Sequence, residues 1–141
     1  HRHYFDNVVS GLQDAGLGDQ FQYAGAPDRD AKIALFHQMD VMSVPATYDE
    51  PKGFTLLEAM ANGVPVVHPD RGPFTEIVRS PGGGLLVAKD DPDALADGLL
   101  TLLQDRTKAA ALGRAGAEGV RRQYTVDHMA MAAERAYAQL R

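Results

Sequence analysis

Hydrophobic and polar residues follow two different periods along the chain. Short apolar runs, such as Val64-Pro-Val-Val67, are typical of buried strands. Between the runs, apolar residues recur at the spacing of an amphipathic helix, as Phe5, Val8 and Leu12 do. The two periods predict strands over 21–25, 40–44, 64–67 and 85–87, and helices over 3–17, 28–39, 54–62, 74–79, 91–103, 107–123 and 126–140.

The order of these elements predicts the fold class. Strands and helices alternate as far as residue 87, and such alternation is typical of a mostly parallel sheet with helices on both faces. Three further helices follow, two of them rich in alanine. No repeat, linker or low-complexity segment divides the 141 residues. We therefore expect one α/β domain with additional C-terminal helices.

Composition narrows the range of partners. The chain is 45% hydrophobic with a formal net charge of −5, and it has no cluster of lysine and arginine. These features argue against nucleic acid or an anionic membrane surface as the main partner. The absence of cysteine excludes disulfides and thiolate catalysis, and it fits a reducing compartment. No apolar run approaches the roughly 20 residues of a membrane span.

The histidines offer little metal chemistry. The five of them are scattered, and none forms an i, i+4 pair in a metal-ligand pattern. We therefore expect no metal site. His68 follows a predicted strand beside a glycine-containing loop, where a site residue could lie. A histidine in this place is more often only a polar residue at the strand end.

An acid-rich segment from Tyr48 to Gly63 is the best candidate for a binding site. It follows a predicted strand, and ligands of open α/β sheets bind beyond the carboxyl ends of the strands. Gly53 permits a tight turn, and the amides that begin the next helix favour a phosphate. Glu58 lies about one helical turn further on, roughly 6 Å along the axis. Ionised Glu50 and Glu58 would accept hydrogen bonds from hydroxyl groups.

The same segment also fits a purely structural interpretation. Thr55-Leu-Leu-Glu58 matches a capping box, in which Thr55 caps the helix and Glu58 bonds back to the amide of Thr55. Asp49 and Glu50 would also favour the helix dipole. On spacing alone, capping is the stronger of the two interpretations.

Two other sets of residues need an explanation. Gly113, Gly116 and Gly119 recur every three residues in an alanine-rich helix, which indicates close packing against a neighbour. Lys52 and Arg71 lie in loops that could face a phosphate, although exposed basic residues usually only face water.

The stretch from Val44 to Val67 resembles the donor-binding half of retaining GT-B glycosyltransferases, the large family that contains sucrose synthase and many bacterial mannosyl- and glucosyltransferases. It has that family's two glutamates separated by seven residues, followed by Glu-Ala-Met-Ala and Gly-x-Pro-Val-Val. The resemblance extends outward over residues 21–25, 72–76 and 84–95 and over the last helices. It therefore covers essentially the whole chain, and it implies a Rossmann-like sheet.

The resemblance implies a role for each residue of the candidate site. Glu58 would accept hydrogen bonds from the ribose of a nucleoside diphosphate sugar, and Glu50 would lie beside the donor sugar as the catalytic residue. The amides of Gly53, Phe54 and Thr55 would hold the pyrophosphate or the sugar. Gly25 and its neighbours would border the base.

The sequence departs from the family pattern in several places. Lys52 stands where an aromatic or small residue is usual, and Pro73 replaces a common glycine. The family's first strand, its glycine loop and the Lys and Arg that neutralise pyrophosphate would all precede His1. We therefore expect residues 1–141 to be a C-terminal nucleotide-sugar-binding domain, without its first strand and without the N-terminal acceptor domain.

The resemblance implies a parent enzyme that transfers a glycosyl group with retention, without a bound metal or cofactor, in the cytoplasm or at the membrane periphery. The isolated chain would be inactive and would tend to self-associate. Two alternatives are a GT-B-like binding or interaction module without catalysis, and a nucleotide-sugar epimerase or phosphorylase relative. A phosphorylase would use pyridoxal phosphate on a lysine, and no lysine here has the matching motif. The base, the sugar and the acceptor are not specified by the sequence.

Overall fold

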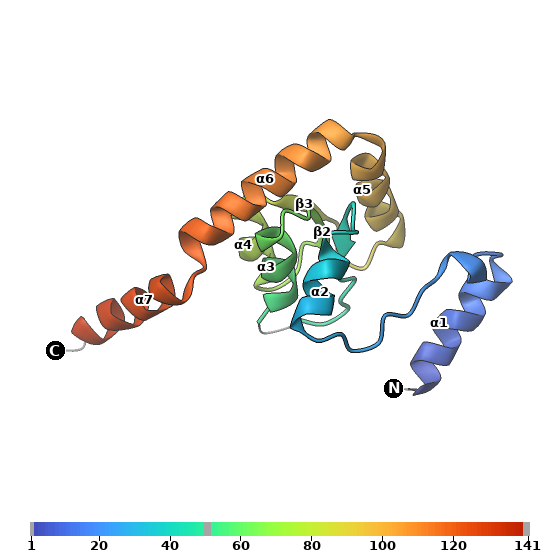
Figure 1. Cartoon of the computed structure of the whole chain (residues 1–141), viewed down its shortest axis with the longest axis horizontal. Helices are drawn as coiled ribbons and strands as arrows, with labels where there is room; N and C mark the ends of the chain where they lie inside the picture. The colour runs from blue at the N-terminus through green and yellow to red at the C-terminus, as the bar shows by residue number, and fades with distance from the viewer. Residues whose placement is uncertain (1, 50–51, 140–141) are drawn as a thin grey trace. The chain divides into compact units, whose positions relative to one another are not determined.

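The structure, a computed structural model, describes residues 2–49 and 52–139. It contains two compact units, His1–Lys32 and Ile33–Arg141. Figure 1 labels helices α1 to α7 and strands β2 and β3.

The N-terminal unit begins with helix α1 (Arg2–Asp14), which is followed by the short 3-10 helix η1 (Gly18–Gln20). The helix predicted over 3–17 is confirmed, but it ends earlier. Gly16 has a φ of 71°. Its amide donates to Gln13 at 2.9 Å, and the Leu17 amide donates to Leu12 at 2.8 Å. This is a Schellman motif, which ends a helix at a glycine in the left-handed conformation.

The strand predicted over 21–25 is wrong, because these residues, all of them described, form no strand. Their aromatic side chains pack on α1 instead. The ring centroid of Phe5 lies 4.8 Å from that of Tyr23 and 6.3 Å from that of Phe21. An alternating aromatic pattern fits a strand or an extended segment equally well, and a strand also needs a hydrogen-bonded neighbour.

The second unit contains a three-stranded sheet in the order β1-β2-β3. All of its pairs are parallel, with Met42 opposite Val66 and Val66 opposite Gly84. The strands are β1 (Met42–Ser43), β2 (Val66–Pro69) and β3 (Gly84–Val87). The predicted parallel sheet is therefore confirmed, although β1 is shorter than expected and β2 begins later.

The late start of β2 has a local cause. Helix α3 (Phe54–Ala61) ends in a Schellman motif at Gly63, whose φ is 80°. The Val64 amide donates to Ala59 at 3.0 Å, so Val64 still belongs to the helix end. The strand can begin only after this turn is complete.

The other predicted helices are confirmed, with small shifts at their ends. Several begin at side chains that accept a hydrogen bond from the first turn: Asp91 from the Ala94 amide, Asp105 from the Lys108 amide and Thr125 from the His128 amide. The helices are α2 (Arg29–Phe36), α4 (Phe74–Arg79), α5 (Pro92–Gln104), α6 (Arg106–Gln123) and α7 (Val126–Ala138).

Helices cover both faces of the sheet. On one face Val66 belongs to a buried cluster with Leu56 and Met60 of α3 and Phe74 of α4. On the other face α5 approaches so closely that a Cβ on Gly98 would lie 2.8 Å from the side chains of both Val67 and Val87. The two-faced α/β architecture predicted from the sequence is confirmed.

The glycines of α6 permit close packing, as their spacing predicts. A Cβ on Gly113 would lie 2.2 Å from the carbonyl oxygen of Gly63, and one on Gly116 would lie 2.9 Å from the Cα of Gly83. Helix α6 therefore packs directly on backbone at the end of α3 and before β3 (Figure 1).

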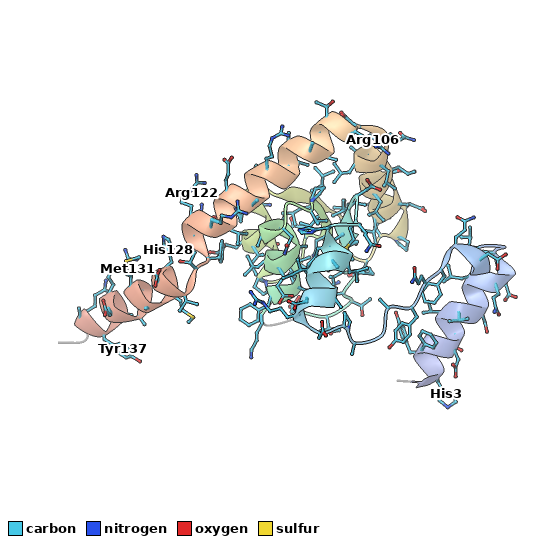
Figure 2. The ribbon with its side chains drawn as sticks, in the orientation of Figure 1. His3, Arg106, Arg122, His128, Met131 and Tyr137 are labelled. Atoms are coloured by element: carbon cyan, nitrogen blue, oxygen red, sulfur yellow. The ribbon has the colours of Figure 1, made fainter. Side chains whose placement is uncertain are left out.

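Helix α7 is exposed except at His128, which is half-buried, and none of its residues, all of which the structure describes, is buried. Met131 and Tyr137 project from it (Figure 2). Across the described residues, no helix has both the length and the apolar character needed to cross a bilayer.

Candidate functional site

The candidate site lies at the carboxyl edge of the sheet. The three strands are parallel, so the segments that follow them begin at the same edge. One leads from β1 to α3, one from β2 to α4 and one from β3 to α5. The acid-rich loop therefore leaves the carboxyl end of a strand, as predicted.

Gly53 determines how the chain enters α3. It is the N-cap residue, with a φ of 59°. It is buried, and a Cβ there would lie 2.6 Å from Cδ1 of Ile77 and 3.0 Å from a ring carbon of Phe74. Both the conformation and the space require glycine.

The capping-box interpretation of Thr55 is wrong. The helix begins at Phe54 with Gly53 as its cap, and no side chain among the described residues caps it. Thr55 is therefore already inside the helix, and Glu58 is its fifth residue, whereas a capping box needs the glutamate at the third. The first amides of an α-helix have no acceptor within the helix. At the start of α3 the Leu56 amide donates to Gly53 at 3.1 Å, and the amides of Phe54 and Thr55 lie at the carboxyl edge of the sheet, where a phosphate could bind.

The structure brings most of the predicted site residues together on α3. Gly53, Phe54 and Thr55 form its start, and Glu58 follows about one turn later with a half-buried side chain. Glu50 lies outside the described residues. Gly25 belongs to the N-terminal unit and has a φ of 69°, so its predicted place beside the base stays a prediction.

The pairing of Arg71 with two carboxylates is a feature that the sequence interpretation did not identify. Arg71 was expected to face a phosphate or water, but its side chain is only 14% exposed and is paired with carboxylates. Nη2 lies 2.5 Å from both carboxylate oxygens of Asp90, and Nη1 lies 4.0 Å from Oδ1 of Asp49. The three residues come from the three segments that follow the strands. The sequence does contain a signal for this contact, because all three residues follow predicted strands.

His68 is also placed differently from the expectation. It lies in the central strand β2 and is 0% exposed, so the interpretation as a polar strand end is wrong. Its Nδ1 lies 2.7 Å from the carbonyl oxygen of Pro69, and its ring centroid lies 4.0 Å from that of Phe74. A central strand covered by a helix buries even its polar side chains. We therefore assign His68 to the core.

A groove lies beside the carboxyl edge of the sheet. It has a volume of about 390 Å³ and is lined by Pro45, Pro69, Asp90 and Leu95 among others. Within the described ranges, no group of three or more His, Cys, Asp or Glu residues is arranged to hold a metal ion. The edge thus combines helix amides, the carboxylate of Glu58 and an open groove.

Comparison with known proteins identifies the family. The family model described as glycosyl transferases group 1 matches residues 2–119. The chain belongs to this family. The resemblance that the segment from Val44 to Val67 indicates is thereby confirmed.

A named relative of this group 1 domain supports the family assignment. A phosphatidyl-myo-inositol mannosyltransferase of Mycobacterium leprae is 38% identical over 110 residues, which are 78% of this chain and 29% of the relative. The chain spans about a third of the length of the relatives named here.

Solved structures show the same fold. A sucrose-phosphate synthase from Thermosynechococcus elongatus has a TM-score of 0.84 and 31% identity, over 96% of this chain and 34% of that one. Alr3699/HepE of Anabaena, in complex with UDP-glucose, has a TM-score of 0.82 and 25% identity, over 98% of this chain and 38% of that one. The group 1 domain described here thus has the fold of a glycosyltransferase domain.

Proposed function

We propose that this chain is the donor-binding domain of an enzyme that transfers a sugar from a nucleoside diphosphate sugar to an acceptor. The observation that carries the proposal is the start of α3. In a group 1 glycosyltransferase domain, this helix begins at a left-handed glycine, with no side-chain cap among the described residues, at the carboxyl edge of a parallel sheet. The Anabaena structure, whose fold is similar, contains UDP-glucose.

In this proposal each group at the edge has a chemical role. The amides of Gly53, Phe54 and Thr55 bind the pyrophosphate or the sugar, because a helix start favours negative charge. Glu58 accepts hydrogen bonds from the ribose hydroxyls. Glu50 acts beside the donor sugar, and Gly25 borders the base.

The finer features of the parent enzyme are also proposals. The parent transfers its sugar with retention and without a bound metal or cofactor. It works in the cytoplasm or at the membrane periphery. The name of the Mycobacterium leprae relative, which refers to a phosphatidylinositol, supports a peripheral location. The isolated chain, which spans about a third of the length of the relatives named above, has no transferase activity.

Nucleotide binding by the chain itself tests the proposal. Isothermal titration and amide chemical shifts would be recorded with UDP, GDP, ADP and the corresponding sugar nucleotides. We expect one base to bind in preference to the others, with the largest shifts at Phe54 and Thr55. The proposal fails if every nucleotide leaves the amides at the start of α3 unchanged.

A further inference from the structure

We propose that Arg71 is a positioning residue for donor binding, which sets the path of the segment between β1 and α3. The inference rests on the proposed function, because it concerns the same binding site. Arg71 follows β2 and is paired with Asp49, which precedes α3, and with Asp90, which precedes α5. One side chain therefore connects all three segments at the carboxyl edge of the sheet.

The segment that follows β2 contacts the connection between β1 and α3 at Asp49, before α3 begins. Nη1 of Arg71 lies 4.0 Å from Oδ1 of Asp49, close enough for charge attraction. The next residue, Gly72, has a φ of 52°, and a Cβ there would lie 3.3 Å from Oδ1 of Asp49. The backbone at residue 72 therefore passes directly beside Asp49.

The same segment also contacts this connection at Gly53, the residue that directly precedes α3. Phe74 begins α4, and its ring would lie 3.0 Å from a Cβ on Gly53. Residues 71–74 thus contact the path to α3 on both sides, at Asp49 and at Gly53. A displacement of residues 71–74 would therefore move the cap of α3, and with it the amides that bind the donor.

Asp90 anchors Arg71 on its other side. Both carboxylate oxygens of Asp90 lie 2.5 Å from Nη2 of Arg71. Asp90 has a φ of 59°, which is unfavourable for a residue other than glycine. The next residue, Asp91, caps α5 by accepting from the Ala94 amide at 2.9 Å. Arg71 is therefore joined to the start of a helix that packs on the sheet.

Direct binding of the donor phosphate by Arg71 is the competing role. The surroundings of Arg71 favour positioning, because two carboxylates already neutralise its charge and its side chain is only 14% exposed. The two roles differ in the effect of lysine. A lysine would still attract a phosphate as a point charge, but its single ammonium group does not reproduce the fork that joins two carboxylates.

The main experiment compares Arg71→Met with Arg79→Met. Arg79 is a matched control, because it lies on α4 after the same segment and pairs with Asp70 at 3.6 Å while 68% exposed. UDP-glucose affinity would be measured by titration, and amide exchange of residues 48–57 would be measured without nucleotide. We expect Arg71→Met to weaken UDP-glucose binding roughly tenfold and to speed exchange at Leu56 and Leu57, whose amides donate to Gly53, whereas Arg79→Met changes neither.

Two more variants separate positioning from folding. Asp90→Gly removes the carboxylate but suits the left-handed backbone, so it should keep the melting temperature while still speeding exchange at Leu56 and Leu57. Arg71→Lys should behave like Arg71→Met if Arg71 positions the loop, and like the unchanged chain if it binds phosphate. Either Arg71→Met with unchanged exchange, or full rescue by Arg71→Lys, overturns the inference. If the unchanged chain binds no nucleotide, the proposed function fails, and the ligand-free exchange still decides the inference.

Discussion

Gly53 and Gly63 show how one residue can determine the course of the backbone. Both have a positive φ, of 59° and 80° respectively. A Cβ on Gly63 would meet nothing within 4 Å, whereas one on Gly53 would lie 2.6 Å from Ile77. A comparison of the two positions therefore separates the free-energy cost of a left-handed backbone from the free-energy cost of steric overlap.

Replacing each glycine by alanine should give different losses of stability. Gly63→Ala should cost about 1 kcal/mol, the usual cost of a left-handed conformation for a residue with a Cβ. Gly53→Ala should cost about 1–3 kcal/mol more, because the methyl group overlaps the core. Urea unfolding of both variants measures the difference. Equal losses would show that Ile77 and Phe74 yield without cost.

Glu58 has a ligand role in the proposed function, and a conservative variant can test it. Glu58→Gln keeps the size of the side chain and one acceptor oxygen, so it should hardly change the melting temperature. A carboxylate that accepts two hydroxyls forms charge-assisted hydrogen bonds, each of about 1.5–3 kcal/mol. Nucleotide affinity should therefore fall at least about tenfold. Normal nucleotide binding by this variant would remove Glu58 from the site.

At the scale of elements, the packing of α6 depends on glycines along one face of the helix. Alanine normally stabilises a helix relative to glycine by about 1 kcal/mol. At Gly113 the opposite should hold, because a Cβ would lie 2.2 Å from the carbonyl oxygen of Gly63. The packing of α6 on the end of α3 thus reverses the usual effect of helix propensity.

Gly113→Ala should consequently destabilise the second unit by about 1–3 kcal/mol, since the backbone at Gly63 would have to move. Ala111→Gly, at an exposed position of the same helix, is the control. It should cost about 1 kcal/mol from propensity alone. Thermal unfolding followed by circular dichroism measures both. A stabilised Gly113→Ala variant would show that α6 does not pack as described.

At the scale of the whole molecule, α7 presents apolar side chains to solvent. Val126, Met129 and Tyr137 are 75%, 69% and 71% exposed. They follow one another at spacings of three and eight residues, which places them near one face of the helix. An exposed apolar face of this kind favours association.

We therefore expect the 141-residue chain to self-associate at high concentration through α7. Met129→Glu should shift it toward the monomer, because a charge would enter the contact. Ala138→Glu adds the same charge on the other side of the helix and should have little effect. Light scattering over a concentration series measures both. A strictly monomeric unchanged chain would contradict the expectation.

Local interactions made much of this protein predictable from its sequence. The helix over residues 74–79 was predicted at its observed bounds, and helices α5 (Pro92–Gln104) and α7 (Val126–Ala138) were predicted near theirs, because periodicity and capping involve neighbours in the chain. The parallel sheet followed from the order of the elements. The family followed from the ordered motifs between Val44 and Val67, which the family match confirms.

Contacts between distant residues decided the rest. Residues 21–25 have the pattern of a strand, but Phe21 and Tyr23 pack on Phe5 instead. The buried position of His68 depends on the strands beside it, and the connection of Arg71 with Asp49 and Asp90 depends on three loops meeting at one edge. Sequence spacing reports which residues are neighbours along the chain. Only the tertiary structure brings together side chains that are far apart in the chain, such as Arg71 and Asp90, which are 19 positions apart.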